Sequence, residues 1–355
     1  MSGEGLGRDG GDAREGAARA SIGLLRRRID GLGEVVAGAL SGRFEAAAGA
    51  LSGDVIVTGV GASLGTARLF AWLCADRLRI GARFAPISAF AGEVPPAGRT
   101  LVVVSQGLSP NARLALRHAG RYERTIVLTS ARPSSDGAGE LLAQIAGRGG
   151  VIVRHPPEEE GGMLLRVLGP AAAAAAACAI VETARGAGEL LAEIAGKISD
   201  AIATAPARAE EAAAGVTSEM LDGPCAFVSV GVDPGVLVGH RWKWLEGLRR
   251  CEPCGWDLLE IAHGPIQSAA RPMPFFVLAS AGDGGDALRG RLGEVLSPGG
   301  HPRVTLRSAL GFPFSIADHD AQLDALLLRV LDERPRDLAV SACAGDDEPL
   351  YGMGR

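Results

Sequence analysis

The stretch VIVTGVGASLGTARLF runs from Val55 to Phe70 and decides how the chain folds. An apolar run of strand-favouring residues ends in a glycine turn, and residues at helical spacing follow it. Gly59, Gly61 and Gly65 give the spacing G-x-G-x-x-x-G, one residue longer than the dinucleotide fingerprint, and no lysine follows as in a P-loop. The stretch therefore predicts a strand, a turn and a helix, and it disfavours a nucleotide-dependent dehydrogenase.

The same arrangement recurs in the second half of the chain. Helical spacing at 22–40 precedes the first strand, and helical spacing at 191–202 precedes the run CAFVSVGVD at 225–233. The two units start about 170 residues apart, as in an internal repeat. Further apolar runs alternate with helical stretches: LVVVSQG (101–107), TIVLTSA (125–131), GVIVRHP (150–156), PFFVLAS (274–280) and RVTLRSA (303–309). This alternation predicts an α/β fold of two tandem doubly wound domains, each a five-stranded parallel sheet flanked by helices.

The expected domain boundaries follow from these patterns. Residues 1–19 form an N-terminal segment that we expect to be disordered, since its start is rich in glycine and polar residues. The first domain is expected at 20–185 and the second at 186–340. Residues 341–355 form a tail that contains glycine and aspartate.

Composition narrows the classes of partner. The chain has 355 residues, of which 47% are apolar and 22% charged, and its net charge is −5. This balance disfavours a nucleic-acid or anionic-membrane partner, because such surfaces are usually basic. The most apolar segment, 167–181, is too short and too rich in alanine to cross a bilayer. No signal-peptide pattern opens the chain, and six cysteines form no disulfide framework, so we expect a cytoplasmic protein.

Two turns in the first half could bind an anion. The turns at 59–67 and 105–112, GVGASLGTA and SQGLSPNA, each join a strand to a helix, and a helix N-terminus presents free N–H groups. The hydroxyls of Ser63, Ser105 and Ser109 could add donors. A structural explanation stays open for both turns, since Ser109 before Pro110 also fits a simple helix cap.

The stretch KWLEGLRRCEPCGWDLLEIAHGPIQ, Lys243 to Gln267, carries a resemblance to a known family. It resembles the K-x-x-E…E-x-x-H-G-P region of the sugar isomerase (SIS) family, and in particular the isomerase half of glucosamine-6-phosphate synthases. RPRDLAVS at 334–341 resembles the closing segment of that family, and both first-half turns fall where its sugar-phosphate loops lie. The resemblance spans about residues 20–341 and agrees with the repeat.

The resemblance implies the catalytic roles. Glu246 would be the base that moves a proton between C1 and C2 of a sugar. His263 would assist ring opening, and Lys243 would support the charge of the enediolate. Such an exchange needs one carboxylate on one face of the enediol and a donor near its oxygens. A purely structural explanation stays open for each of them. Glu246 could be an exposed helix residue, His263 a turn residue and Lys243 a surface lysine.

The resemblance also implies a set of substrate-binding residues. These would hold the anionic end of the ligand or face it: Ser63, Ser105, Gln106, Ser109 and Glu160. SIS proteins commonly complete their sites between subunits, so we expect a homodimer or a larger homo-oligomer. The implied ligand is a small sugar or sugar phosphate, with no cofactor and no metal.

The chain departs from the family at two places. The family loop typically reads S-Q-S-G-E-T, whereas the chain has SQGLSP at 105–110. In glucosamine-6-phosphate synthases a lysine follows NLA near the C-terminus, whereas here DLA is followed by Val340. No glutamine-hydrolysing domain precedes the repeat, so we expect no amidotransfer from glutamine.

Two functions remain open at this point. One is a tandem-SIS isomerase or deglycase acting on a phosphosugar or amino-sugar derivative by enediol-type proton transfer. The other is a non-catalytic sugar-phosphate-binding or regulatory protein. A metal site at the C-x-x-C pair of Cys251 and Cys254 is disfavoured, because a second cysteine pair is missing and the segment resembles a turn.

Overall fold

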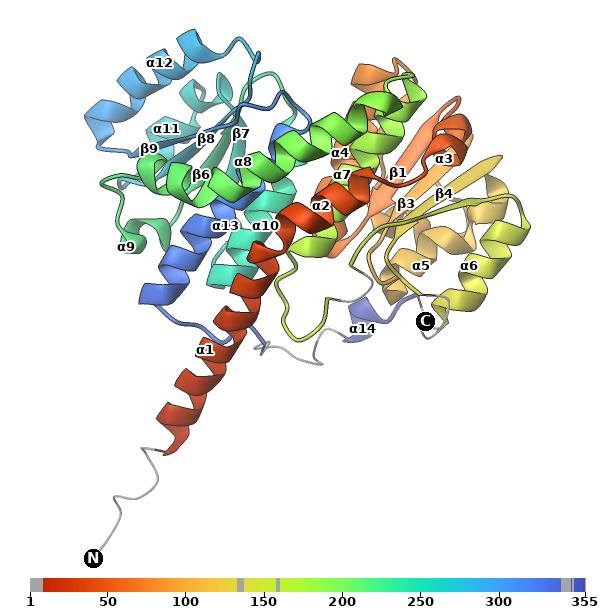
Figure 1. Ribbon diagram of the computed structural model, residues 1–355, viewed down its shortest axis with the longest axis horizontal. Coiled ribbons are helices and arrows are strands. Elements are labelled where there is room, and N and C mark those ends of the chain that lie inside the picture. The colour runs from red at the N-terminus through yellow and green to blue at the C-terminus, as the bar shows by residue number, and fades with distance from the viewer. Residues whose placement is uncertain (1–8, 133–136, 158–159, 340–345, 347, 355) are drawn as a thin grey trace, which may run out of the picture.

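The computed structural model describes residues 9–132, 137–157, 160–339, 346 and 348–354. Val340 and the start of the N-terminal segment lie outside the described residues. The helices cover both sheets, and the two halves of the chain lie side by side (Figure 1). None of the described helices combines the length and the apolar composition needed to cross a membrane.

The first half forms the expected five-stranded parallel sheet. Its order is β2-β1-β3-β4-β5, with bounds Ala82–Phe84, Val55–Gly59, Thr100–Val104, Arg124–Thr129 and Val151–Arg154. All residues of β1 and β3 are buried. Helices on both faces explain why these strands read as continuous apolar runs.

The second half forms a parallel sheet of four described strands, where five were expected. Its order is β7-β6-β8-β9, with bounds Cys254–Asp257, Ala226–Ser229, Phe275–Ala279 and Arg303–Arg307. After β9 the chain passes directly into a helix at 315–333, and the sequence beyond 333 contains no further apolar run of strand length. Cys254, expected in a turn, begins the edge strand β7.

The helices connect and cover the strands. Their bounds are α1 Asp9–Asp30, α2 Leu32–Leu40, α3 Glu45–Ala50, α4 Leu64–Arg77, α5 Pro110–Arg117, α6 Ala138–Gly147, α7 Leu168–Ala184, α8 Leu191–Ala212, α9 Ser218–Leu221, α10 Val238–Leu248, α11 Pro265–Ser268, α12 Asp286–Leu296, α13 Ser315–Glu333 and α14 Glu348–Tyr351. Short 3-10 turns are η1 Gly61–Ser63, η2 Ile87–Phe90, η3 Ala119–Arg121, η4 Gly188–Leu190, η5 Pro234–Leu237, η6 Glu260–Ala262 and η7 Ser297–Gly299.

The N-terminal segment differs from the expectation. Residues 9–19, expected to be disordered, belong to α1, whose first half projects from the body of the molecule (Figure 1). The apolar pattern at 22–40 forms two helices rather than one. Gly31 lies between them, where the missing side chain weakens a helix.

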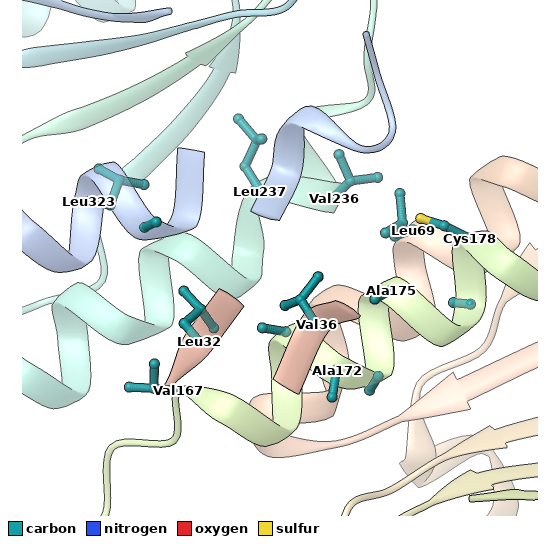
Figure 2. Close-up of a cluster of buried hydrophobic side chains, with 14 of the residues drawn as sticks. Leu32, Val36, Leu69, Val167, Ala172, Ala175, Cys178, Val236, Leu237 and Leu323 are labelled. Atoms are coloured by element: carbon teal, nitrogen blue, oxygen red, sulfur yellow. The ribbon is translucent and has the colours of Figure 1, made fainter. Parts of the chain in front are cut away.

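A shared apolar core joins the two halves. The alanine-rich α7 packs against α2, α3 and α4, and α8 packs against both α2 and α13. Buried side chains from both halves form one cluster, and Figure 2 shows part of it. The small side chains of α7 allow neighbouring helices to approach closely.

The halves meet most closely at two glycines. A Cβ on Gly65, in the first turn of α4, would lie 2.8 Å from the backbone nitrogen of Gly239, in the first turn of α10. Side chains at these positions would push the two helices apart. Because α4 and α10 follow the central strands β1 and β6, this contact brings the carboxyl end of β1 close to α10.

Candidate functional site

A cavity opens at the junction of the two halves. It holds about 800 Å³ of empty space, including the space at its mouth. Helices α2, α4, α7 and α8 form its walls on one side, and η5, α10 and α13 form them on the other. Its lining includes Val36, Leu69, Arg166, Ala175, Cys178, Ile198, Val236, His240, Trp242, Lys243, Glu246, Phe314, Ile316 and Asp320.

Glu246 has the electrostatics expected of a base. It lies on α10, lines the cavity and is partly buried. Burial raises the pKa of its carboxyl to about 7, although the nearby positive charge of Arg166 works in the other direction. A carboxyl with a pKa near neutral can accept a proton and return it at physiological pH.

Lys243 lies one helical turn before Glu246 and is fully engaged within the protein. Its Nζ atom donates to Asp320 Oδ2 at 2.5 Å and to Asp324 Oδ2 at 2.9 Å. Burial alone would lower the lysine pKa, but the two carboxylates outweigh burial and raise it. The ammonium is therefore permanently charged and paired with α13.

His240 extends this network along α10. Its Nδ1 atom lies 2.8 Å from Asp320 Oδ1, so the carboxylate of Asp320 bridges the histidine and the lysine. Asp324 differs from Asp320: its burial raises its pKa to about 6, while Lys243 opposes that rise. The pKa of Asp320 lies below its ordinary value, because Lys243 and His240 outweigh its burial.

Arg166 is a positive group in the cavity that the sequence did not identify. It precedes α7, lines the cavity and lies close enough to Glu246 to act on its pKa. The same guanidinium acts on Arg28, which forms an ion pair with Glu160. Arg166 thus lies within electrostatic range of both the expected base and the ion pair of Arg28 with Glu160.

Ser63 and Ser105 follow neighbouring strands. Gly59 at the end of β1 pairs in register with Val104 at the end of β3, and each serine follows its strand end. Both serine side chains are buried. Neither belongs to the described residues that line the cavity, although the turn with Ser63 contributes its neighbour Ala62.

Glu160 binds both Gln106 and the start of α7. The carboxylate of Glu160 accepts from the backbone nitrogens of Val167 at 2.8 Å and Leu168 at 3.0 Å, and from that of Gly169 at 2.9 Å. It also accepts from Gln106 Nε2 at 3.3 Å. Glu160, expected to face the ligand, instead neutralises a helix N-terminus.

Ser109 and His263 lie elsewhere. Ser109 precedes α5 with Pro110 at the first helical position, and its side chain makes no capping hydrogen bond. His263 ends η6 after β7 and is exposed, and it does not belong to the described lining of the cavity. Within one chain the structure therefore does not bring His263 to Glu246.

The cysteine pair and the possible metal ligands complete the description of the candidate groups. Cys251 and Cys254 are exposed free thiols. Within the described ranges, no group of three or more histidine, cysteine, aspartate or glutamate side chains is arranged to hold a metal ion.

Sequence reasoning missed the acidic partners of Lys243. A usable signal existed in α13, where Asp320 and Asp324 are four residues apart and therefore lie on the same face of a helix that is rich in leucine. Carboxylates at such positions require a buried cation. The sequence alone does not show that this cation is Lys243.

The chain is similar to known proteins in its fold. No family model matches the chain, and no curated protein matches it. Solved structures do match: a glucosamine-6-phosphate deaminase from Thermotoga maritima has a TM-score of 0.67 at 16% identity, covering 90% of this chain and 98% of that one.

Two other structures agree with it. The C-terminal domain of glucosamine-fructose-6-phosphate aminotransferase from Francisella tularensis has a TM-score of 0.67 at 11% identity, covering 88% of this chain and 96% of that one. Tagatose-6-phosphate ketose/aldose isomerase from Escherichia coli has a TM-score of 0.58 at 13% identity, with coverage of 93% and 94%. The expected α/β fold of the SIS type is confirmed.

Proposed function

We propose that the cavity at the junction of the two halves is the active site of a sugar isomerase that works by enediol-type proton transfer. The proposal starts from the fold that the chain shares with sugar-phosphate isomerases and deaminases. The observation that carries it is Glu246, a carboxyl in this cavity whose pKa burial raises to about 7.

The proposed reaction uses an open-chain sugar. The Glu246 carboxylate takes the proton from C2, and the electrons of that C–H bond form the C1=C2 double bond while O1 becomes the enediolate oxygen. Glu246 then returns the proton to C1, the proton of O2 passes to O1, and O2 becomes the ketone oxygen. Atoms and charge balance, and one carboxyl performs both transfers.

Arg166 is proposed to stabilise the enediolate. It lines the cavity beside Glu246, so its guanidinium can lie near developing negative charge. The resemblance assigned the stabilisation of the enediolate to Lys243. Its ammonium, however, forms ion pairs with Asp320 and Asp324. We therefore propose that Lys243 positions α10, and with it Glu246, rather than the substrate.

His263 is proposed to act from a second subunit. It is exposed and away from the cavity of its own chain. This assignment requires at least a homodimer, which light scattering would detect as twice the monomer mass. A monomer at micromolar concentration would remove His263 from the mechanism.

Exchange of the C2 proton in D₂O tests the proposal directly. Proton NMR would follow wild type with D-glucose 6-phosphate, D-glucosamine 6-phosphate and the unphosphorylated sugars. Glu246→Gln keeps the shape but removes the base, and should slow exchange by about 10²–10⁴-fold while binding persists. Glu34→Gln, which removes an exposed carboxylate on α2, is the matched control.

The outcomes separate the candidate functions. Full exchange by Glu246→Gln would remove Glu246 as the base. Ligand binding without exchange in wild type would favour the non-catalytic sugar-binding protein. That alternative draws support from the first-half groups Gln106 and Glu160, which bind each other.

A further inference from the structure

We propose that the ligand of this cavity carries an apolar group, and not a phosphate, at the end away from its reacting carbons. This inference rests on the proposed function and names the substrate class: an unphosphorylated sugar derivative with a short alkyl or aromatic substituent. Three independent features carry it, namely the cavity walls, the charges in the cavity and the anion-binding groups of the first half.

The walls of the cavity are largely apolar. Figure 2 shows Val36, Leu69, Ala175, Cys178 and Val236 converging from α2, α4, α7 and η5, and all of them line the cavity. Other apolar lining residues come from α8, α10 and the start of α13: Ile198, Trp242, Phe314 and Ile316. Trp242, Phe314 and Ile316 are only partly buried, so an apolar group that covers them excludes water and gains free energy. The indole N–H of Trp242 is a hydrogen-bond donor among these walls.

The ionisable groups come from few elements. His240, Lys243 and Glu246 lie on one face of α10, Asp320 lies on the facing part of α13, and Arg166 precedes α7. Pockets that orient a ligand commonly combine a few convergent polar groups with apolar walls. The polar part would hold the carbonyl and hydroxyls of the sugar, and the apolar part would hold the remainder.

The charges do not favour a dianion. Two cations, Lys243 and Arg166, face the carboxylates of Asp320 in the wall and Asp324 behind it. Glu246 adds a further partial negative charge, because its pKa of about 7 leaves it partly ionised at neutral pH. Lys243 is already bound to both aspartates. A phosphate would bring two further negative charges to a site without a positive surplus, and like charges at short range repel strongly where water is excluded.

Some of the first-half groups that could bind an anion, namely Gln106, Arg28 and the start of α7, already bind a protein carboxylate. Glu160 accepts the free backbone N–H groups at the start of α7, and Gln106 donates to the same carboxylate. Arg28 adds an ion pair at 3.6 Å. The side chain of Glu160 is buried, so a phosphate could take its place only by leaving that carboxylate without its partners.

Calorimetric titration with three matched sugars tests the inference. D-glucose, D-glucose 6-phosphate and 6-O-benzyl-D-glucose share the reacting carbons and differ only at O6. In the wild-type protein we expect 6-O-benzyl-D-glucose to bind at least tenfold more tightly than glucose, and glucose 6-phosphate no more tightly than glucose. Tighter binding of glucose 6-phosphate than of both others would overturn the inference.

Two variants test whether the benzyl group binds in the apolar part of the cavity. Ala175→Phe places a ring in the apolar part and should remove the preference for 6-O-benzyl-D-glucose. Ala203→Phe, on the exposed face of α8, is the matched control and should keep it. If glucose 6-phosphate binds best and Arg166→Gln abolishes that preference, Arg166 holds a phosphate and the inference fails.

The test separates this inference from the proposed function. Binding measured by heat requires no turnover, so the ranking of the three sugars stands whether or not C2 exchange occurs. Exchange with glucose 6-phosphate as the preferred substrate would support the isomerase and overturn the apolar substituent. The expected ranking without exchange in any sugar would support the ligand class and overturn the isomerase.

Discussion

The raised pKa of Glu246 has a consequence for stability that can be measured without a substrate. Its pKa rises from the ordinary 4.5 to about 7, mainly because the carboxyl is desolvated in the folded protein. Between these two pH values the unfolded chain releases a proton that the folded chain retains. The stability linked to this group is therefore complete below pH 4.5 and is lost as the pH rises through about 7.

The size of the effect follows from the two pKa values. One pKa unit corresponds to about 1.4 kcal/mol. The difference between 4.5 and about 7 thus corresponds to a loss of about 3 kcal/mol across this range, of which about 2.5 kcal/mol falls between pH 5 and pH 8. The amide that Glu246→Gln introduces cannot titrate, so the variant lacks this loss.

Urea unfolding of wild type and Glu246→Gln at pH 5 and pH 8 measures the difference. We expect the free energy of unfolding of the variant, relative to wild type, to increase by about 2–3 kcal/mol from pH 5 to pH 8. Glu34→Gln, at an exposed position, should show no such pH dependence. A difference between Glu246→Gln and wild type that is the same at both pH values would refute the reasoning, whatever its absolute size.

Two further changes probe the groups around the site. Glu160→Gln removes the negative charge at the N-terminus of α7 and should lower the free energy of unfolding by about 1–2 kcal/mol. Urea unfolding measures this loss, and an unchanged free energy of unfolding would contradict the capping role of Glu160. Lys243→Met leaves the carboxylates of Asp320 and Asp324 buried without their cation, and should lower the free energy of unfolding by about 3–5 kcal/mol. Adding Asp320→Asn and Asp324→Asn to Lys243→Met should recover part of that loss, and equal stability of single and triple variants would argue against the pairing.

The fold could be predicted where strands are buried on both sides. The central strands β1, β3, β6 and β8 contain apolar runs, and the sequence located each of them. The edge strands β2 and β7 were missed, because ARF and CGWD contain no such run. The edge strands β5 and β9 were located, because VIVR and RVTLR contain apolar or alternating residues, so the apolar run and not the edge position decides whether a strand can be predicted.

The candidate site also has a part that the sequence predicts and a part that it does not. Glu246 and Lys243 came from a local motif on one helix, and both line the cavity. The contacts of Lys243 with Asp320 and of Gln106 with Glu160 join segments 77 and 54 residues apart. Local spacing carries no information about such pairs, so their existence follows only from how the helices pack.

The position of the cavity explains why neither half could form the site alone. Helix α10 follows the central strand of the second sheet, yet the contact of Gly65 with Gly239 directs its Glu246 face toward helices of the first half. The proposed base thus comes from one half, while Arg166 and about half of the apolar walls come from the other. A separate first half would expose those walls to water and lack a base, and a separate second half would leave Glu246 in water, where its pKa would have no reason to rise. Joining the halves is what creates both the cavity and a carboxyl able to work in it near neutral pH.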